Sequence, residues 1–288
     1  MEYHRPRTFE EAVGIAATAR GVTRFLAGGT DVLVQLRAGS VTPDTLIDVK
    51  AIPGVREIAA TPEGGWRIGI AVSGAEMGRH AGLCRDWPGV VEGMRLVGST
   101  QVQGRATLVG NLCNGSPAAD SVPGLVAAGA RVTLTGPSGS REVAVEAIPT
   151  GPGRNALQPG EIITAVILPP RGAMGGDAYL RFIPRTEMDI AVVGCAVSLS
   201  LDGGRIAAAR VAAGAVAPTV LLVPEAAAAL IGRALDEAAL DGLARAVSAA
   251  SRPITDRRGS KEFRKDVIAV LARRAAAIAH DRARGAAR

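Results

Sequence analysis

A glycine pair between a strand-like and a helix-like segment constrains this chain most. Residues 22–26 are typical of a buried strand, and the apolar residues of 32–36 can cover one helix face. Gly28 and Gly29 lie between them, where glycine permits a tight turn and close approach of a ligand. Thr30 and Asp31 both favour the N-cap position of a helix. Unpaired amides at a helix start attract anions, so this segment predicts either a pyrophosphate site or a plain strand–helix turn.

A second glycine-containing stretch lies at residues 107–120. Gly110 and Asn111 predict another turn that presents backbone amides, and short polar side chains follow at Asn114 and Ser116. Asp120 then precedes an apolar helical segment. Two such turns, each rich in short polar side chains, predict the two sides of one ligand cleft.

Four motifs together resemble the FAD-binding medium subunit of the molybdenum hydroxylases, the family of carbon monoxide dehydrogenase and xanthine dehydrogenase. They occur in the family's order and at its spacing, and they span nearly the whole chain. The motifs are AGGTD at residues 27–31, TLVGN at 107–111 with SPAAD at 116–120, AYLRFIPRTEMDIAVVG at 178–194, and DRRGSKEFR at 256–264.

The resemblance implies an α+β fold with two domains. The first is a two-subdomain FAD-binding fold of the vanillyl-alcohol-oxidase type (PCMH-like), and the second is a C-terminal domain of an antiparallel sheet and helices. We place the FAD-binding domain at residues 1–170, with subdomains at about 1–55 and 56–170, and the C-terminal domain at 177–288. The glycine-rich connector at residues 171–176 predicts the boundary.

The resemblance also implies which residues hold FAD. The first motif would wrap the pyrophosphate through its backbone amides, with Leu26, Ala27, Gly28, Gly29, Thr30, Asp31, Val32 and Leu33. The second would contact the diphosphate and the neighbouring flavin, with Thr107, Leu108, Val109, Gly110 and Asn111.

Further implied contacts lie later in the chain. Asp120, in one motif with Ser116, would bind the far end of the cofactor at a ribose hydroxyl. Ile163 would touch the adenine or the flavin edge. Arg181 stands near the flavin, where relatives often carry Lys, and Tyr179 is a second flavin neighbour or a core tyrosine.

The function implied is electron transfer without a catalytic side chain. A large partner subunit would hold the molybdenum cofactor, and a small partner subunit would carry two [2Fe–2S] clusters. Electrons would pass from a cluster through FAD to NAD⁺, a quinone or O₂. The resemblance implies a dimer of heterotrimers, and the substrate would be oxidised on the large subunit.

Composition excludes several other functions. The three cysteines and three histidines are scattered, which argues against a disulfide framework, a cluster or a metal site on this chain. The net charge of +6 comes from dispersed arginines and aromatics are only 3%, so a nucleic-acid partner is not expected. The sequence shows neither a run of ~18 apolar residues nor a signal-peptide core, so we expect a cytoplasmic protein with no membrane span.

Three alternatives stay open at this point. One is a self-contained flavin enzyme of the same broad fold, such as UDP-N-acetylenolpyruvoylglucosamine reductase or a vanillyl-alcohol-oxidase relative. Another is a nicotinamide-binding Rossmann domain, although Gly28-Gly29 lacks the GxGxxG pattern that fold requires. The third is a non-catalytic assembly subunit that has lost FAD.

Several local elements are also predicted. Thr8 should cap a helix that runs to about Arg20, and Ser73 with Glu76 has capping-box spacing. Residues 191–214 predict a hairpin that turns at 202–204, and residues 261–284 predict the last helix.

Overall fold

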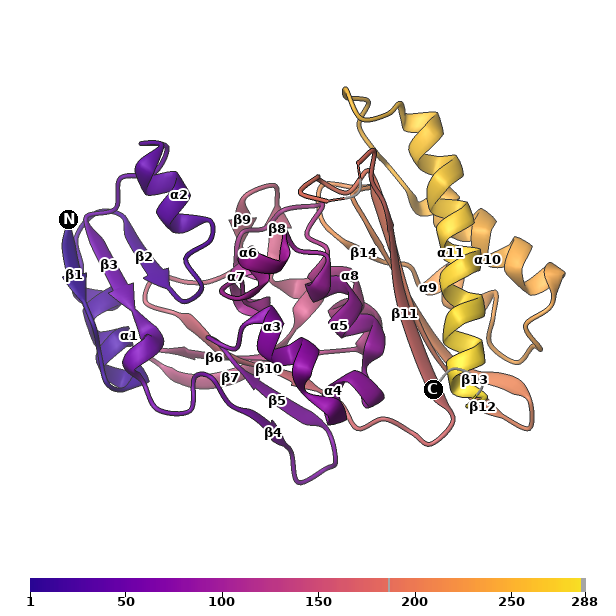
Figure 1. Ribbon diagram of the computed structural model, residues 1–288, viewed down its shortest axis with the longest axis horizontal. Helices are drawn as coiled ribbons and strands as arrows, with labels where there is room; N and C mark the ends of the chain where they lie inside the picture. Colours follow the sequence, from indigo (N-terminus) through magenta and orange to yellow (C-terminus); the bar gives the residue numbers. More distant parts are fainter. Residues whose placement is uncertain (186, 286–288) are drawn as a thin grey trace.

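The computed structural model describes residues 1–185 and 187–285. Thr186, part of the third motif, and residues 286–288 lie outside the described residues. Figure 1 shows three lobes in a row, with the N-terminus on the first and the C-terminus on the last. None of the helices in the described ranges is long and apolar enough to cross a membrane.

The N-terminal lobe is a small parallel sheet with two helices. Its strands are β1 (Glu2–His4), β2 (Thr23–Leu26) and β3 (Thr45–Asp48), in the order β1-β3-β2. Helix α1 (Phe9–Thr18) starts as predicted, because the Thr8 side chain accepts a hydrogen bond from the Glu11 amide at 3.1 Å. Helix α2 (Val32–Arg37) follows β2 after the glycine pair.

The middle lobe is an antiparallel sheet of order β4-β5-β10-β6-β7, covered by short helices. Its strands are β4 (Ile58–Ala60), β5 (Trp66–Gly69), β6 (Arg131–Gly136), β7 (Gly139–Ala144) and β10 (Ile162–Leu168), with a separate hairpin of β8 (Pro149–Gly151) and β9 (Arg154–Asn155). Its α-helices are α3 (Gly74–Arg79), α4 (Ala81–Asp86), α5 (Pro88–Arg95), α6 (Thr100–Gln103), α7 (Leu108–Cys113) and α8 (Ser121–Ala128). The capping box of Ser73 and Glu76 is confirmed at the start of α3.

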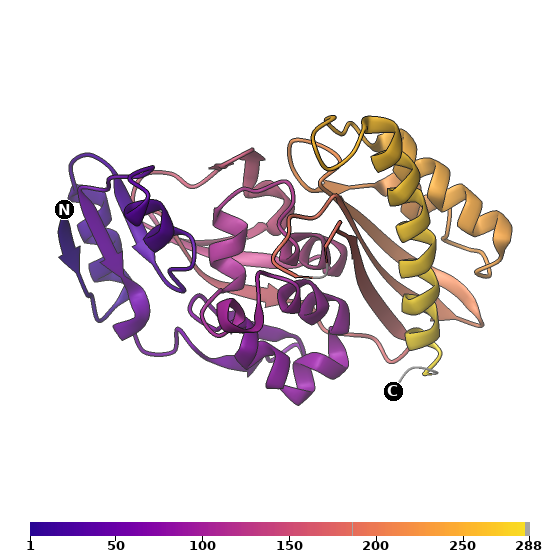
Figure 2. The ribbon, with the colours of Figure 1, turned by 45° about the horizontal axis from the view of Figure 1, so that its top comes forward.

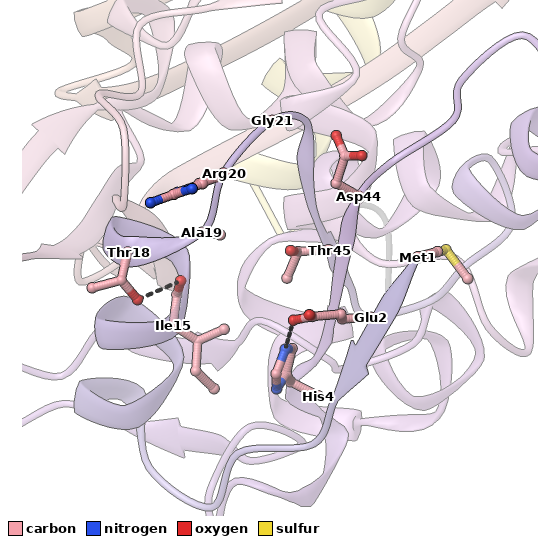
Figure 3. A pocket seen from close by; sticks show the side chains of 10 residues that line it. All are labelled: Met1, Glu2, His4, Ile15, Thr18, Ala19, Arg20, Gly21, Asp44 and Thr45. Carbon is pink, nitrogen blue, oxygen red and sulfur yellow. Dashed lines mark hydrogen bonds and ion pairs between the residues drawn. The ribbon is translucent and has the colours of Figure 1, made fainter.

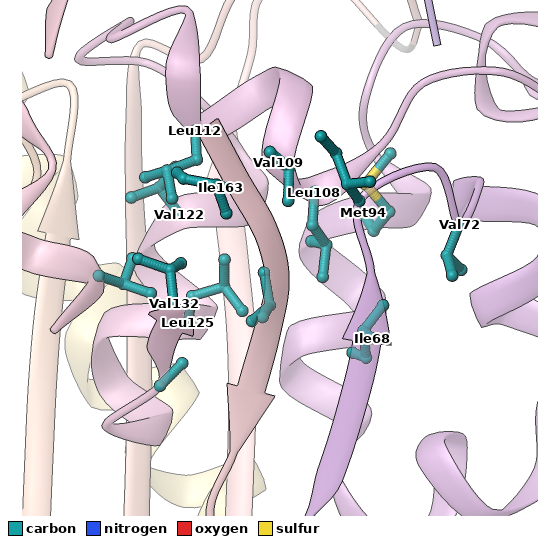
Figure 4. Close-up of a cluster of buried hydrophobic side chains, with 14 of the residues drawn as sticks. Ile68, Val72, Met94, Leu108, Val109, Leu112, Val122, Leu125, Val132 and Ile163 are labelled. Carbon is teal, nitrogen blue, oxygen red and sulfur yellow. The ribbon is translucent and has the colours of Figure 1, made fainter. Parts of the chain in front are cut away.

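One hydrophobic core joins this sheet to its helices. Figure 4 shows Ile163 of β10 and Val132 of β6 beside Leu112 of α7 and Leu125 of α8. All four side chains are buried. The core therefore fixes α7 and α8, which carry the second motif, against the sheet.

The C-terminal lobe contains the sheet β11-β12-β13-β14 and three helices. Its elements are β11 (Gly175–Phe182), β12 (Val193–Asp202), β13 (Arg205–Gly214), β14 (Leu221–Leu222), α9 (Pro224–Ala228), α10 (Glu237–Ala250) and α11 (Lys261–Ala283). The predicted hairpin and the predicted last helix are both confirmed. A second hydrophobic core lies between this sheet and its own helices.

The C-terminal sheet is covered on both faces. Figures 1 and 2 show α11 along the outer face, while α5 and α8 of the middle lobe lie on the inner side. Side chains alternate along β11 accordingly, because successive residues of a strand point to opposite faces. Ala178 packs in the outer core, and Tyr179 packs in the core of the middle lobe.

Close packing of α11 explains why β11 starts inside the glycine-rich connector. Gly175 and Gly176, which the sequence places in that connector, are the first residues of the strand. A Cβ on Gly176 would lie 1.8 Å from the carbonyl oxygen of Ala279 in α11. Glycine is therefore required at position 176 because α11 packs directly on the strand, and not because the connector must be flexible.

Gly176→Ala should lower the free energy of unfolding by about 1–3 kcal/mol, because the new methyl group must push α11 off the sheet. Gly14→Ala in α1 is the matched control, since a Cβ there meets nothing within 4 Å. That control should gain stability by up to about 1 kcal/mol from helix propensity. Urea unfolding of both variants measures the difference, and equal midpoints would contradict the packing argument.

A buried ion pair lies where the last two lobes meet. The carboxylate of Asp177, on β11, is 3.1 Å from the guanidinium of Arg171. Arg171 in turn lies over the ring of Trp87, 4.2 Å from its centroid. Burial raises the pKa of Asp177 to about 6, although the positive charge of Arg171 opposes that change.

Asp177→Asn should remove a pH-dependent part of the stability. Because the native state holds the Asp177 proton up to about pH 6 while the unfolded state releases it near pH 4, the wild type loses stability as pH rises between these values. Relative to Asp177→Asn, that loss should reach about 3 kcal/mol. Unfolding measured from pH 4 to 7 tests this, and a difference between the two proteins that does not change with pH would be inconsistent with it.

Candidate functional site

The first glycine turn lies against the backbone that leads into the second motif. A Cβ on Gly28 would be 2.2 Å from the carbonyl oxygen of Arg105, and the Arg105 side chain donates to the Gly28 carbonyl at 3.2 Å. Gly29 has φ +80°, a left-handed conformation that glycine adopts without strain. The predicted meeting of the two stretches is therefore present in the fold.

The first turn presents a row of backbone amides. Within the described part of the chain, the amides of residues 28–32 donate no hydrogen bond to another protein group. Leu26, at the end of β2, is buried and anchors the row, whereas Leu33 is exposed on α2. Consecutive unpaired amides at a strand–helix junction suit the oxygens of a diphosphate. The residues present thus fit that part of FAD.

The Asp31 side chain makes a long-range contact instead of capping its helix. It stands at the N-cap position of α2, but its side chain makes no capping hydrogen bond. Instead its carboxylate accepts a hydrogen bond of 2.7 Å from the side-chain amide of Asn114. The predicted N-cap position of Asp31 is therefore confirmed, whereas its side chain does not cap the helix, because Asn114 from the second glycine-containing stretch takes the carboxylate and joins the two stretches.

The second motif is a helix rather than the predicted turn. Gly110 and Asn111 lie inside α7, and the Thr107 hydroxyl caps it by accepting from the Gly110 amide at 3.0 Å. Leu108 and Val109 are buried in the core (Figure 4). The Asn111 side chain accepts from the Ser121 hydroxyl at 2.7 Å, which ties α7 to α8.

Asp120 joins the middle lobe to the C-terminal lobe. One carboxylate oxygen accepts from the Tyr179 hydroxyl at 2.8 Å, and the other accepts from Arg181 at 2.6 Å. The same Arg181 nitrogen donates to the carbonyl of Leu96 at 2.8 Å. Burial raises the pKa of Asp120, and the charge of Arg181 with these hydrogen bonds opposes the rise. The network therefore holds β11 beside α8.

The remaining predicted residues lie apart from this network. The Ile163 side chain, on β10, is buried in the hydrophobic core of the middle lobe. Ser116 is exposed, and its hydroxyl accepts a hydrogen bond from the Ala118 amide at 3.3 Å. Cys113 of the second motif is desolvated, which raises its thiol pKa to about 12. Such a thiol is a poor nucleophile at neutral pH, as expected for a small packing residue.

A pocket of about 510 Å³ opens beside Arg181. It is lined by Arg95, Leu96, Gly98, Thr100, Gln103, Arg181 and Glu187. Apart from Arg181, none of these residues was predicted as a site residue. Glu187 lies in the third motif with Arg181, and the other five come from residues 95–103, a stretch that none of the four motifs covers. A larger pocket of about 680 Å³ lies between α1 and the sheet of the N-terminal lobe (Figure 3), and none of the predicted site residues lines it.

Comparison with known proteins covers nearly the whole chain. Residues 1–171 match the family described as the FAD binding domain in molybdopterin dehydrogenase, and residues 178–279 match the CO dehydrogenase flavoprotein C-terminal domain. The chain is 30% identical to the putative xanthine dehydrogenase FAD-binding subunit of Escherichia coli strain K12, over 94% of this chain and 93% of that protein. It is 32% identical to the carbon monoxide dehydrogenase medium chain of Afipia carboxidovorans, over 99% and 98% of the two chains.

Solved structures agree with these matches. A chain of the carbon monoxide dehydrogenase from Hydrogenophaga pseudoflava superposes with a TM-score of 0.93 at 29% identity, covering 98% of each chain. A chain of quinoline 2-oxidoreductase from Pseudomonas putida 86 superposes with a TM-score of 0.89 at 25% identity, covering 99% of this chain and 98% of that one.

Tyr179→Phe should lower the free energy of unfolding by about 1–3 kcal/mol, because it leaves a buried oxygen of Asp120 without a donor. The control is Tyr3→Phe, which removes a similar 2.7 Å hydrogen bond to Asp48. Tyr179 is 2% exposed and Tyr3 is 54% exposed, so water can replace only the second hydroxyl. The control should therefore change stability by less than about 1 kcal/mol. Equal losses of unfolding free energy in urea would show that burial of the Asp120 hydrogen bonds does not add to stability.

Proposed function

Because this chain belongs to the family of FAD-binding medium subunits of the molybdenum hydroxylases, we propose that it holds FAD between its two motifs and passes electrons to an external acceptor. The row of unpaired amides at residues 28–32, held against the second motif, is the observation that supports this most directly. A strand–helix turn without a ligand has no need of five free donors beside a second polar motif.

The proposed binding residues act mainly through their backbone. Leu26 to Leu33 surround the diphosphate, with the amides of Gly28 to Val32 as donors. Thr107 to Asn111 approach the diphosphate and the flavin at the start of α7, where the amides of Leu108 and Val109 are also unpaired within the described residues. Ser116 belongs to this polar rim, being exposed beside α7.

Side chains complete the proposed site. Each oxygen of Asp120 has one protein donor, which leaves lone pairs for a ribose hydroxyl. Arg181 lines the pocket beside Leu96 and carries a fixed positive charge near the flavin. Ile163 contributes apolar packing behind α7, and Tyr179 orients Asp120. Bound FAD supplies the redox chemistry, while these residues hold and orient it.

The partner subunits and the electron acceptor are part of the same proposal. We propose a large subunit with the molybdenum cofactor, where the organic or inorganic substrate is oxidised, and a small subunit with [2Fe–2S] clusters. A dimer of such heterotrimers in the cytoplasm, with NAD⁺, a quinone or O₂ as acceptor, completes the proposal. The support is the near-complete coverage of medium chains from multi-subunit dehydrogenases.

Gly28→Ala should lower the ratio of flavin to protein in the purified complex by about tenfold or more. The new methyl group would collide with the Arg105 carbonyl and part the two motifs. Gly172→Ala is the control, because a Cβ there meets nothing within 4 Å. The measurement is the flavin absorbance of wild type and both variants, with urea unfolding to check that each is folded. A wild-type complex without flavin, or a folded Gly28→Ala that keeps it, would refute the proposed site.

A further inference from the structure

A hydrogen bond between two side chains links the two glycine-containing stretches, and Asn114 donates it. The side-chain amide nitrogen of Asn114 lies 2.7 Å from a carboxylate oxygen of Asp31, which is 83 residues earlier in the chain. Because an ionised carboxylate can only accept, the nitrogen of the Asn114 amide must be the atom that faces it. Asn114 lies two residues before Ser116 but is not among the residues that the resemblance assigns to FAD. Its contact is therefore additional to the proposed cofactor contacts.

Asn114 stands on a well-supported part of the backbone, at the end of α7. The Asn155 side chain donates to the carbonyl of the preceding residue, Cys113, at 3.0 Å. The following residue, Gly115, has φ +60° and packs closely on β9, so that a Cβ there would lie 2.7 Å from the Arg154 carbonyl oxygen. The donor side chain is therefore carried by backbone that cannot shift easily.

The segment that carries Asp31 has much less support. Helix α2, which follows Asp31, contains no buried residue. The Asp31 side chain is exposed and makes no capping hydrogen bond. Among the described residues, Asn114 is the one group that donates to its carboxylate. Without the Asn114 amide, the carboxylate would therefore be free to rotate toward its own backbone.

A released carboxylate would compete with a bound anion for the same donors. The amides of residues 28–32, which include that of Asp31 itself, donate to no protein group within the described ranges. Aspartate side chains commonly accept hydrogen bonds from their own or neighbouring backbone amides. A released carboxylate would also bring negative charge closer to a bound diphosphate, and like charges repel. Both effects would weaken the binding of a diphosphate.

We infer that Asn114 is a positioning residue that holds the Asp31 carboxylate away from the amides of residues 28–32, an inference that rests on the proposed function. While the carboxylate accepts from Asn114, the amides stay unpaired within the protein. The diphosphate then meets a row of donors without a competing acceptor. Asn114 acts through Asp31, so this role needs no contact between Asn114 and the cofactor.

The test asks whether the loss of Asn114 is harmful only while the Asp31 carboxylate is present. The full chain, with the subunits that co-purify with it, is stripped of flavin and titrated with FAD. The dissociation constant is read from the change in flavin fluorescence. The variants are Asn114→Ala and the double variant Asn114→Ala with Asp31→Ala, and urea unfolding checks that each is folded.

Asn114→Ala should weaken FAD binding about tenfold or more, because the released carboxylate takes amide donors and repels the diphosphate. The double variant should bind FAD about tenfold more tightly than Asn114→Ala does, because the competing group is gone.

A double variant that binds no more tightly than Asn114→Ala would overturn the inference. A direct contact with FAD, or a hydrogen bond that merely joins the two stretches, is missing from both variants and cannot be restored by removing Asp31. Wild-type affinity in Asn114→Ala would overturn the inference as well. A wild type that binds no FAD would instead overturn the proposed function.

Asn155 provides the matched control, because its side chain supports the same end of α7 through the Cys113 carbonyl. In Asn155→Ala the Asp31 carboxylate is still held by Asn114. Adding Asp31→Ala to Asn155→Ala should therefore give no tenfold gain in FAD affinity. An equal gain in the Asn114→Ala and Asn155→Ala backgrounds would show that removal of the charge alone strengthens binding, and it would overturn the positioning role of Asn114.

Discussion

A buried carboxylate that is shared between two lobes is the interaction on which the proposed site depends. Asp120 closes the second motif, and its two oxygens receive hydrogen bonds from Tyr179 and Arg181 on β11. A buried charge is tolerated only when it is paired and hydrogen-bonded. Removing any one of these three side chains would therefore leave a buried polar group without its partner and lower the stability of the protein. Because Arg181 also reaches the Leu96 carbonyl, the network sets the edge of the pocket and the direction of the C-terminal sheet.

Close backbone contacts make this geometry possible. A Cβ on Gly93 of α5 would lie 2.6 Å from the Asp120 carbonyl oxygen, and one on Gly124 of α8 would lie 3.0 Å from the carbonyl of Gly89. The two helices therefore meet backbone to backbone beneath the C-terminal sheet. Gly28 does the same for the first turn against Arg105. In each place, the absence of a side chain on glycine allows segments that are distant along the chain to come into contact.

Local patterns predicted much of the fold. The strand, turn and helix of residues 22–36, the capping box at Ser73, the turn that joins β12 to β13, and α11 are all marked by patterns within a few residues. Residues four apart or fewer meet whatever the rest of the chain does, so their pattern is visible in sequence. The family assignment also rested on sequence, since four ordered motifs spanning the chain carried the resemblance that the matches to known families confirm.

Contacts between distant residues were decided by the tertiary structure. Asp31 is a residue type that commonly caps helices, yet its carboxylate accepts a hydrogen bond from Asn114, which lies 83 residues later. Gly110 and Asn111 suggest a turn, yet packing on the sheet and the Thr107 cap keep them helical. The pocket beside Arg181 is likewise assembled from two separate segments, residues 95–103 and 181–187. The sequence alone thus determined most of the elements, the family and the positions of the motifs proposed to bind FAD, because these are local or ordered along the chain. Only the tertiary structure decided which polar groups form hydrogen bonds within the protein and which remain free for a ligand or partner. The reason is that each polar group pairs with the groups that folding places next to it.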